Sequence, residues 1–435
     1  MKYPKILIIG QYFNTGSGGG ITMTNLFKGW DKENIAVAAR DIYNPNFEVC
    51  HQYYQLGTLE NKSKFPFNLN RWGKHIKSGV IFEKEVSASS SLTGDLRKSR
   101  FKKMYLHLLH FTGLFHYKRR YSVSNNFLAW VKEFSPDIIY SQLSTIELIE
   151  FVIGLQNTLK LPIAIHIMDD WPVTISKKGL LQSYWQKIID KKFRKLLSLS
   201  KIKFSISEAM SKEYLTRYGY YFIPFHNPID IRFWGISSKT NYEFNGSFII
   251  LYAGRIGIGI QNCFLDIAKA ISNLNSKGLK IELHIQATNF NPILDVLAKF
   301  NFVKLNASVP YNELPEKFSK SDLLLLPNDF DCKSISYLRY SMPTKASEYM
   351  VSGSPILLYS SIETAVTSHA LKYKWAYVVS EKNMGKLESA ILEIYEKKEL
   401  RIKLATTAKE YAINHFDGSK IREQFKNSFI LETSD

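Results

Sequence analysis

The chain has 435 residues, and its content of 45% hydrophobic and 22% charged residues is that of a globular protein. This length is too great for one compact core and predicts two domains. Three scattered cysteines exclude a disulfide framework or a zinc site and indicate a reducing cytosol, and no run of about 18 apolar residues could span a membrane.

The net charge of +18 is concentrated in the first half of the chain and favours an anionic partner. Residues 60–125 hold 14 Lys or Arg against 4 Asp or Glu, and residues 171–221 hold 11 against 3. Between Phe101 and Phe115 apolar residues recur every three to four positions beside Lys102 and Lys103, as in a basic amphipathic helix that binds a membrane surface. A core-facing helix is the alternative. No recognised basic helix or finger motif supports nucleic-acid binding.

Short apolar runs alternate with helical patterns, which is typical of α/β layers with parallel strands. The first half predicts strands at residues 5–9, 35–39, 138–140, 163–167 and 204–206. The second half predicts strands at residues 248–252, 281–285, 303–305, 323–326, 355–358 and 376–379. We therefore expect one Rossmann-like domain over residues 1–235, with a basic insert at about 60–120, and a second over residues 236–416. The polar stretch 237–246 is the expected linker, and residues 417–435 are expected to form a helix that packs back onto the first domain.

A glycine-rich loop follows the first predicted strand. Gly18, Gly19 and Gly20 precede a helix expected to begin near Ile21, and glycines let a ligand approach the backbone closely. A dinucleotide site with Asp41 on the ribose is an alternative. The third glycine of that fingerprint is absent and the loop is too long for it, so a nicotinamide enzyme is the weaker interpretation.

Polar residues follow the strand predicted at residues 163–167. His166 lies near its end, and Asp169 and Asp170 come next. Active sites of α/β proteins place polar groups at such strand ends. One of the two aspartates is alternatively a helix cap. Two adjacent carboxylates lack the D-x-D spacing that suits a divalent cation, so no metal site is predicted.

The second half of the chain carries an anion-binding pattern. Pro343, Thr344 and Lys345 open a predicted helix, and Glu348 lies one turn further in. A helix start with a lysine suits a phosphate or diphosphate, and Arg255, directly after a predicted strand, adds a bidentate donor. An ordinary well-capped helix is the alternative for this segment taken alone.

With these motifs the chain resembles the retaining glycosyltransferases of family 4, which have the GT-B architecture of two Rossmann-like domains facing across a cleft. It is most similar to the bacterial enzymes that build capsule, O-antigen or other surface polysaccharides. The segments that carry the resemblance are residues 18–20, 166–172, 205–210, 227–230, 253–255, 309–315, 322–327 and 343–355.

The resemblance implies roles for particular residues. Arg255, Thr344 and Lys345 would bind the donor diphosphate, Glu348 the ribose hydroxyls, and the backbone near Val309 the base. Gly19 and Gly20 would approach the donor. Two positions depart from the family pattern: Ile260 stands where many members have a lysine, and Tyr340 where many have an acidic residue.

The function expected from this resemblance is transfer of one sugar, with retention, from a nucleotide-sugar donor to a lipid-linked saccharide acceptor. The expected catalytic residues are His166, which would contact the donor sugar, Arg255 and Lys345; Asp169 or Asp170 would orient the acceptor. The nucleotide sugar is a substrate, so no cofactor or metal is expected. The expected location is the cytoplasm, peripherally at the inner face of the plasma membrane. The alternative is a catalytically decayed saccharide- or membrane-binding subunit.

Overall fold

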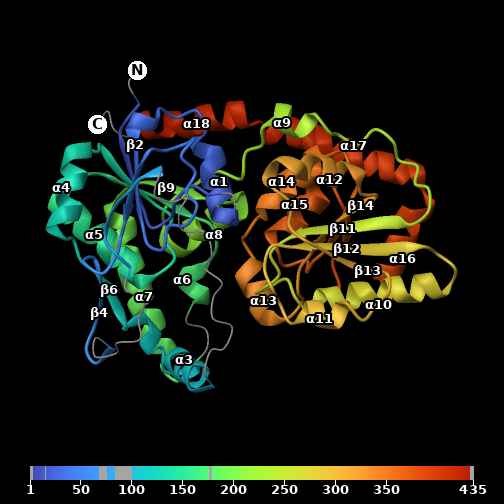
Figure 1. Ribbon diagram of the computed structural model, residues 1–435, viewed down its shortest axis with the longest axis horizontal. Coiled ribbons are helices and arrows are strands. Elements are labelled where there is room, and N and C mark those ends of the chain that lie inside the picture. Colours follow the sequence, from blue (N-terminus) through green and yellow to red (C-terminus); the bar gives the residue numbers. More distant parts are fainter. Residues whose placement is uncertain (1–2, 15, 68–75, 84–99, 176–178, 432–435) are drawn as a thin grey trace. The chain divides into compact units, whose positions relative to one another are not determined.

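The structure is a computed structural model that describes residues 3–14, 16–67, 76–83, 100–175 and 179–431 (Figure 1). The chain divides into two compact units. The first comprises Met1–Phe225 with Arg422–Asp435, and the second comprises His226–Ile421. Both are α/β units built on largely parallel sheets, as the strand–helix alternation predicted. Parts of the predicted basic insert, residues 68–75 and 84–99, lie outside the described residues.

The first unit contains an eight-stranded sheet with the order β10-β9-β8-β7-β1-β2-β3-β5. All neighbours are parallel except β3 and β5. A separate antiparallel pair joins β4 and β6. The strands are β1 (Ile6–Ile9), β2 (Ile35–Ala39), β3 (Gln52–Gln55), β4 (Asn61–Ser63), β5 (Gly79–Ile81), β6 (Arg119–Tyr121), β7 (Ile138–Ser141), β8 (Ile163–Ile167), β9 (Ser200–Ser205) and β10 (Ile223–Pro224).

Helices cover both faces of this sheet, which is why β1, β2 and β8 are buried along their whole length. The helices are α1 (Gly18–Phe27), η1 (Lys32–Asn34), α3 (Arg100–Thr112), η3 (Leu114–His116), α4 (Asn125–Phe134), α5 (Ile146–Leu159), α6 (Trp171–Thr174), α7 (Gln182–Leu199), α8 (Glu208–Tyr218) and α18 (Gly418–Leu431). A serine or threonine hydroxyl accepts a backbone N–H at the start of four of them, where it fixes the helix boundary; these caps are Ser17, Ser124, Thr145 and Ser207.

The second unit contains a fully parallel six-stranded sheet with the order β13-β12-β11-β14-β15-β16. Its strands are β11 (Phe248–Gly254), β12 (Ile281–Ala287), β13 (Val303–Asn306), β14 (Leu323–Pro327), β15 (Ile356–Tyr359) and β16 (Tyr377–Val379). Its helices are α9 (Ile231–Gly235), α10 (Cys263–Ser276), α11 (Ile293–Leu297), η4 (Tyr311–Glu313), α12 (Leu314–Lys320), α13 (Cys332–Leu338), α14 (Thr344–Val351), α15 (Ala365–Tyr373), α16 (Met384–Glu396) and α17 (Lys398–His415).

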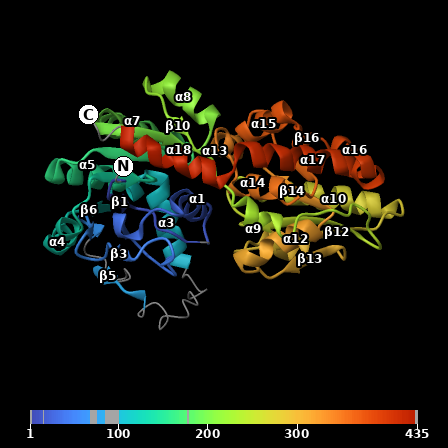
Figure 2. The ribbon, with the colours of Figure 1, turned by 90° about the horizontal axis from the view of Figure 1, so that it is seen from above.

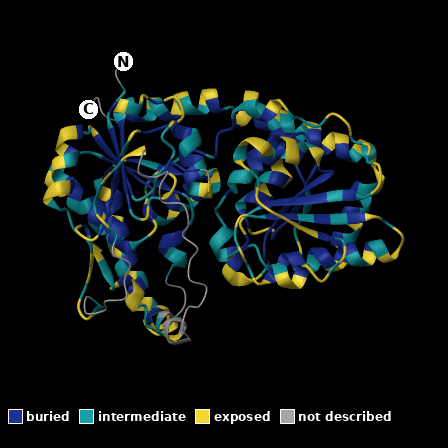
Figure 3. Cartoon of the chain, in the orientation of Figure 1, coloured by how far each residue is buried: buried dark blue, intermediate teal, exposed yellow. Residues whose placement is uncertain are grey.

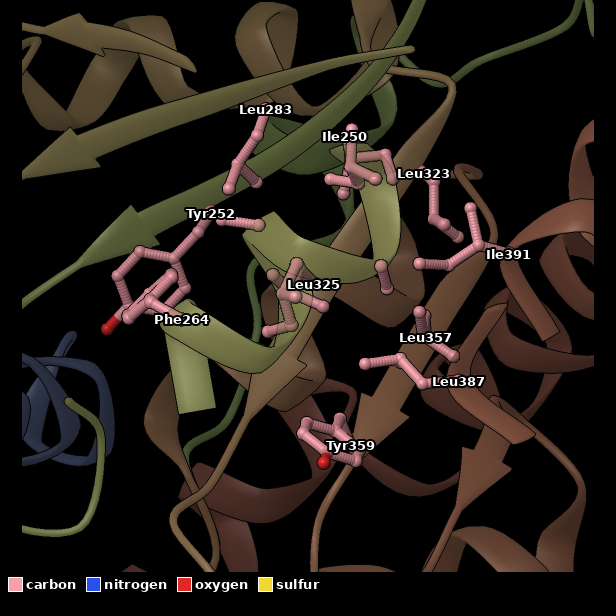
Figure 4. Close-up of a cluster of buried hydrophobic side chains, with 14 of the residues drawn as sticks. Ile250, Tyr252, Phe264, Leu283, Leu323, Leu325, Leu357, Tyr359, Leu387 and Ile391 are labelled. Carbon is pink, nitrogen blue, oxygen red and sulfur yellow. The ribbon is translucent and has the colours of Figure 1, made fainter. Parts of the chain in front are cut away.

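Side chains of alternate residues in β11 point to opposite faces of the second unit's sheet. Ile250 and Tyr252 point into a cluster that α10 and α16 close with Phe264 and Ile391 (Figure 4). On the opposite face the backbone N–H of Ala253 donates to the Tyr349 hydroxyl of α14 at 3.0 Å. The Tyr349 contact therefore holds α14 beside the carboxyl end of β11.

The domain boundary expected at residue 235 is corrected to Phe225. The expected linker, residues 237–246, is part of the second unit, because Lys239 is bound there from both ends. Its N–H donates to the Ser352 carbonyl at 2.9 Å, and its ammonium lies 3.3 Å from the Asp322 carboxylate in a pair less than 10% exposed. The polar composition that suggested a linker reflects these paired groups.

The C-terminal segment belongs to the first unit from Arg422 onward (Figure 2). Phe425 and Phe429 of α18 are fully buried there. Their rings contact Tyr140 of β7 and Phe204 of β9, and Phe425 also meets Phe27 of α1. The end of the chain therefore supplies part of the core of the unit that its beginning forms.

The sequence patterns missed the short strands β3, β4, β5, β6 and β10. These strands have two to four residues. Segments this short carry too little apolar alternation to be recognised locally, and pairing with neighbouring strands decides their conformation.

Candidate functional site

The first turn of α14 carries the predicted anion-binding residues. Pro343 is the N-cap residue and Thr344 the first helical residue, and among the described residues no side chain caps this end. Thr344 therefore lies within the helix, at its first position. The helix start presents N–H groups and a positive dipole end, the combination that binds anions.

Lys345 lies at this helix start against the end of β11. Its ammonium is 4.0 Å from the centroid of the Tyr252 ring and forms no ion pair among the described residues. Burial lowers the pKa of Lys345 to about 7, and the charge of Glu348 offsets part of this effect. A cation so poorly solvated gains from an anionic ligand.

Gly254 shows how closely the lysine approaches the strand end. A Cβ atom at Gly254 would lie 2.3 Å from the Lys345 Nζ, and the residue has a φ of +142°. Only glycine fits this position, because any larger side chain would displace the ammonium.

Arg255 follows directly and is exposed. Its carbonyl accepts a hydrogen bond from the Tyr252 hydroxyl, and its guanidinium forms no ion pair among the residues that the structure describes. The structure thus brings Arg255 and Lys345 to the same strand end, around Tyr252. Two cations that form no ion pair with the described residues are an arrangement suited to a diphosphate.

Glu348 lies one turn into α14 and is 4% exposed. The hydroxyl of Tyr311 donates to its Oε1 at 3.1 Å. Burial raises the pKa of Glu348 to about 7, while the Tyr311 hydrogen bond and Lys345 oppose the rise. The carboxylate can therefore accept hydrogen bonds from hydroxyl groups. In this structure one of its oxygens accepts such a bond from Tyr311.

Tyr311 connects Glu348 to the segment predicted to meet a base. Val309 lies two residues before it, between β13 and η4, and is half-buried. The Tyr311 ring is parallel to that of Phe233 at 5.6 Å and contacts Trp234, both on α9. Tyr311 and Glu348 therefore belong to one local group, and Val309 is two residues from it in the sequence.

The first residues of the second unit form hydrogen bonds with the first turn of α14. The Asn227 amide donates to the Thr344 carbonyl at 3.2 Å, and the Ser347 hydroxyl donates to the Asn227 carbonyl at 3.0 Å. His226 Nε2 lies 3.3 Å from the Pro343 carbonyl. The motif at residues 227–230 thus fixes the helix start in place.

Asp329, at the end of β14, fixes the loop that follows Arg255. Its carboxylate accepts the N–H groups of Gln261 and Cys263, and its own N–H donates to the Gly259 carbonyl at 2.7 Å. The turn closes on itself through two hydrogen bonds between Gly257 and Ile260. Ile260 therefore occupies a turn position, where it supplies no charge.

The glycine-rich loop of the first unit differs from the prediction. The helix α1 begins at Gly18, so Gly19 and Gly20 form its first turn. A Cβ at Gly20 would lie 2.3 Å from the Asn14 amide, whereas one at Gly19 would lie 3.1 Å from the Gln11 amide and 3.4 Å from that of Gln142. Side chains of the same unit thus approach these glycines.

His166 is placed in the interior of the first unit, which argues against the predicted contact with the donor sugar. Its side chain is fully buried, and Nδ1 lies 2.8 Å from the Tyr140 hydroxyl. Burial lowers the pKa of His166 to about 3, so the ring is neutral. The residue precedes the strand end by one position, and β8 is buried on both faces, so neither orientation would expose the ring.

Asp170 is bound within its own unit. Its carboxylate accepts two hydrogen bonds from Arg217, at 2.7 and 3.1 Å, and one from the Tyr214 hydroxyl at 2.9 Å. It is 3% exposed and ties the start of α6 to α8. This placement favours a structural role over the predicted acceptor contact, whereas Asp169 is half-buried at the strand end.

The residues that sequence reasoning missed are Tyr252, Tyr311 and Asp329. Tyr311 stands within a segment that carried the resemblance, but only its contact with Glu348 reveals a role. Among the described residues, no three His, Cys, Asp or Glu side chains gather as metal ligands would, and no helix has the length and apolar character needed to cross a bilayer. A depression lined by Tyr3, Lys160 and Lys201 lies at the amino ends of the first unit's strands.

No protein-family model matches the sequence, and no curated protein matches it. Solved structures match the fold over nearly the whole length. Sucrose-phosphate synthase from Thermosynechococcus elongatus is 11% identical with a TM-score of 0.62, and the match covers 98% of each chain. Anabaena HepE in complex with UDP and glucose is 11% identical with a TM-score of 0.62 and coverage of 98% and 99%. The α,α-trehalose 6-phosphate synthase from Burkholderia multivorans is 12% identical with a TM-score of 0.59 and coverage of 100% and 99%.

These neighbours are GT-B glycosyltransferases, and the chain has the same fold of two Rossmann-like units. The predicted fold class is thereby confirmed.

Proposed function

We propose that this protein is a glycosyltransferase that uses a nucleotide-sugar donor. The observation that carries the proposal is the group at the start of α14: Lys345 and Arg255, neither of which forms an ion pair among the described residues, and Glu348 buried one turn behind them. Cations at a helix N-terminus suit a diphosphate, and a buried carboxylate suits ribose hydroxyls. The nucleotide-bound Anabaena neighbour, of the same fold, supports this assignment.

In this proposal the second unit stabilises the leaving group. Negative charge builds on the diphosphate as the bond to the sugar loosens. Lys345, Arg255 and the N–H groups of α14 would offset that charge from fixed positions, so little reorganisation accompanies the reaction. These groups perform the task without a metal ion, and we propose that the enzyme needs none.

The finer parts of the proposal follow the family resemblance. The transfer proceeds with retention, by attack of the acceptor hydroxyl on the same face as the leaving group, so no protein nucleophile is needed. The acceptor is a lipid-linked saccharide of surface polysaccharide biosynthesis, and Asp169 is the remaining candidate to orient it. The protein works in the cytoplasm, peripherally at the inner face of the plasma membrane. UDP-glucose is the first donor to try, because Anabaena HepE was solved with it.

The test measures release of nucleoside diphosphate from a panel of nucleotide sugars, with and without a chelator. We expect one donor to be hydrolysed or transferred in EDTA, with the anomeric configuration retained in the product. Alanine at Arg255 or Lys345 should lower the rate about ten- to a hundred-fold, the loss of one charge-assisted contact. Lys333→Ala is the matched control, since Lys333 is also the second residue of a helix in this unit, α13, and is exposed.

Wild-type rates in both alanine variants would refute the diphosphate site. Loss of activity in EDTA with recovery in Mg²⁺ or Mn²⁺ would refute metal independence. Release of no nucleoside diphosphate from any donor would instead favour the second candidate, a decayed saccharide- or membrane-binding subunit. The departures at Ile260 and Tyr340 are the observations that keep this candidate open.

A further inference from the structure

Two segments of the first unit expose large apolar side chains. On α3, Met104, Leu108 and Phe111 are 65%, 57% and 50% exposed. Their spacing of four and three residues places them on one face of the helix, while Leu109 is buried on another. About 70 residues later, Leu180, Leu181 and Tyr184 are 73%, 42% and 56% exposed. Figure 3 shows α3 as an exposed element at the end of its unit.

Specific contacts join the two segments into one surface. The N–H of Leu180 donates to the Phe111 carbonyl at 2.7 Å. Gly179 has a φ of +125°, and a Cβ there would lie 2.4 Å from the same carbonyl oxygen, so glycine is required for this approach. Trp185 of α7 packs against Gly113, where an added Cβ would lie 2.3 Å from the indole. We call the six exposed residues Met104, Leu108, Phe111, Leu180, Leu181 and Tyr184 the apolar tip.

Isolated exposed leucines are common on protein surfaces, but a group of this size, supplied by two segments that contact each other, marks an interaction site. The stretches around the apolar tip are rich in Lys and Arg, which indicates a partner with negative charge. Residues 100–120 contain six Lys or Arg and no Asp or Glu. Helix α7 contains five Lys or Arg against one Asp, Asp190, which pairs with Arg194.

Described cations lie beside the tip. Lys187 and Lys191 are exposed on α7, three and seven residues after Tyr184, so all three share one side of the helix. Lys118, after η3, lies over the Tyr105 ring of α3 at 5.4 Å. Apolar side chains bordered by cations match the interface of an anionic bilayer, where the former enter the acyl boundary and the latter meet lipid phosphates.

We propose that the apolar tip docks the protein on anionic lipid bilayers. The sequence predicts such binding through residues 101–120 alone, and the structure adds the segment 180–184 as the second half of the surface. The inference rests on the proposed function only for its purpose, which is access to a lipid-linked acceptor. Docking itself needs no donor and no turnover.

The experiment is flotation of the full chain with vesicles, in the absence of any donor. Vesicles of phosphatidylcholine mixed with phosphatidylglycerol are compared with phosphatidylcholine alone, at low and high salt. We expect binding to the anionic vesicles only, with release by salt. Leu108→Ser and Leu180→Ser test the two halves separately, and each should weaken binding about tenfold or more. Ile362→Ser is the matched control, since Ile362 is 53% exposed in the second unit, and should bind like the wild type.

A second arm tests the charges. Lys187→Glu with Lys191→Glu should abolish binding at physiological salt, whereas Lys299→Glu with Lys333→Glu, two exposed lysines of the second unit, should have a much smaller effect. All changed residues are exposed, so circular dichroism and thermal unfolding should be unchanged and would reveal a variant that does not fold.

Three results would overturn the proposal: no binding to anionic vesicles at low salt, binding that neither serine variant weakens, or an oligomer in solution that Leu180→Ser dissociates, which would make the tip a contact between protein chains. None of these results depends on the donor site. Nucleoside diphosphate release without vesicles should be equal in Leu180→Ser and wild type, so failure here and failure of the transferase proposal are distinguished.

Discussion

Lys345 is the residue on which the donor site most depends. Its ammonium lies over the Tyr252 ring, in the place that only a glycine at position 254 leaves open. Burial lowers its pKa to about 7, so in the free protein the side chain is charged below pH 7 and loses its proton above it. A bound diphosphate needs the charged form.

The affinity for a nucleoside diphosphate should therefore fall above pH 7, by up to about tenfold per pH unit, because binding must then be accompanied by proton uptake. Calorimetry of UDP binding across this pH range measures the effect. Lys345→Arg, which stays charged, should lose the part of the pH dependence that comes from Lys345. The pKa of Glu348 is also about 7, so Glu348→Gln serves to separate the two titrations. A wild-type affinity that does not change with pH would contradict the prediction.

A second prediction at this scale concerns the carboxylate of Glu348. It is 4% exposed and already accepts the Tyr311 hydroxyl, so a ribose would find a fixed acceptor there. Glu348→Gln exchanges one acceptor oxygen for a donor and should weaken binding of the free nucleoside diphosphate about tenfold, in addition to any effect on turnover. Glu363→Gln, an exposed glutamate of the same unit, is the control. Equal affinities for wild type and Glu348→Gln would leave Glu348 a structural residue of α14.

At the scale of elements, the ion pair of Asp170 with Arg217 joins the start of α6 to α8. Variants of this pair distinguish a structural role of Asp170 from a catalytic one. Arg217→Met leaves the Asp170 carboxylate buried without its cation and should cost about 3 kcal/mol of unfolding free energy. Replacing both residues, Asp170→Asn with Arg217→Met, removes both charges and should restore most of that loss. Urea unfolding measures the stabilities, and Arg194→Met, which breaks an exposed pair, should change them little.

The same double variant reports on function. If Asp170 only holds α6 in place, the double variant regains transferase activity together with its stability. A stable double variant without activity would instead place Asp170 at the acceptor, as the sequence had suggested.

At the scale of the whole molecule, the helix α18 completes the hydrophobic core of the first unit. Phe425 and Phe429 are fully buried among rings from α1, β7 and β9, more than two hundred residues away in the sequence. The first unit therefore lacks part of its core until the C-terminal segment is present.

Phe429→Ala should cost about 3–5 kcal/mol, since it removes a fully buried ring. The loss should appear in urea unfolding as an earlier transition of the first unit. Phe290→Ala, whose ring is 71% exposed in the second unit, should stay within about 0.5 kcal/mol of the wild type. A Phe429→Ala protein as stable as wild type would show that α18 packs only loosely.

The sequence alone predicted the parts of the molecule that depend on local patterns. Apolar patterns located eleven strands. They are clearest in strands such as β1, β2 and β14, which are apolar throughout because both of their faces are covered. The residues at α14 were recognised for a similar reason. A proline and a lysine at a helix start, with a glutamate one turn later, form a local arrangement that the rest of the chain need not complete.

Only the tertiary structure decided what depends on contacts between distant residues. His166 lies in the core because both faces of β8 are covered, and Asp170 is bound because Arg217 reaches it from α8. The division after Phe225 and the union of residues 104–111 with 180–184 likewise arise from packing. Composition and spacing show which side chains could take part in a site. Burial and hydrogen bonding are properties of the folded chain, and they decide which of these side chains remain available to bind a ligand.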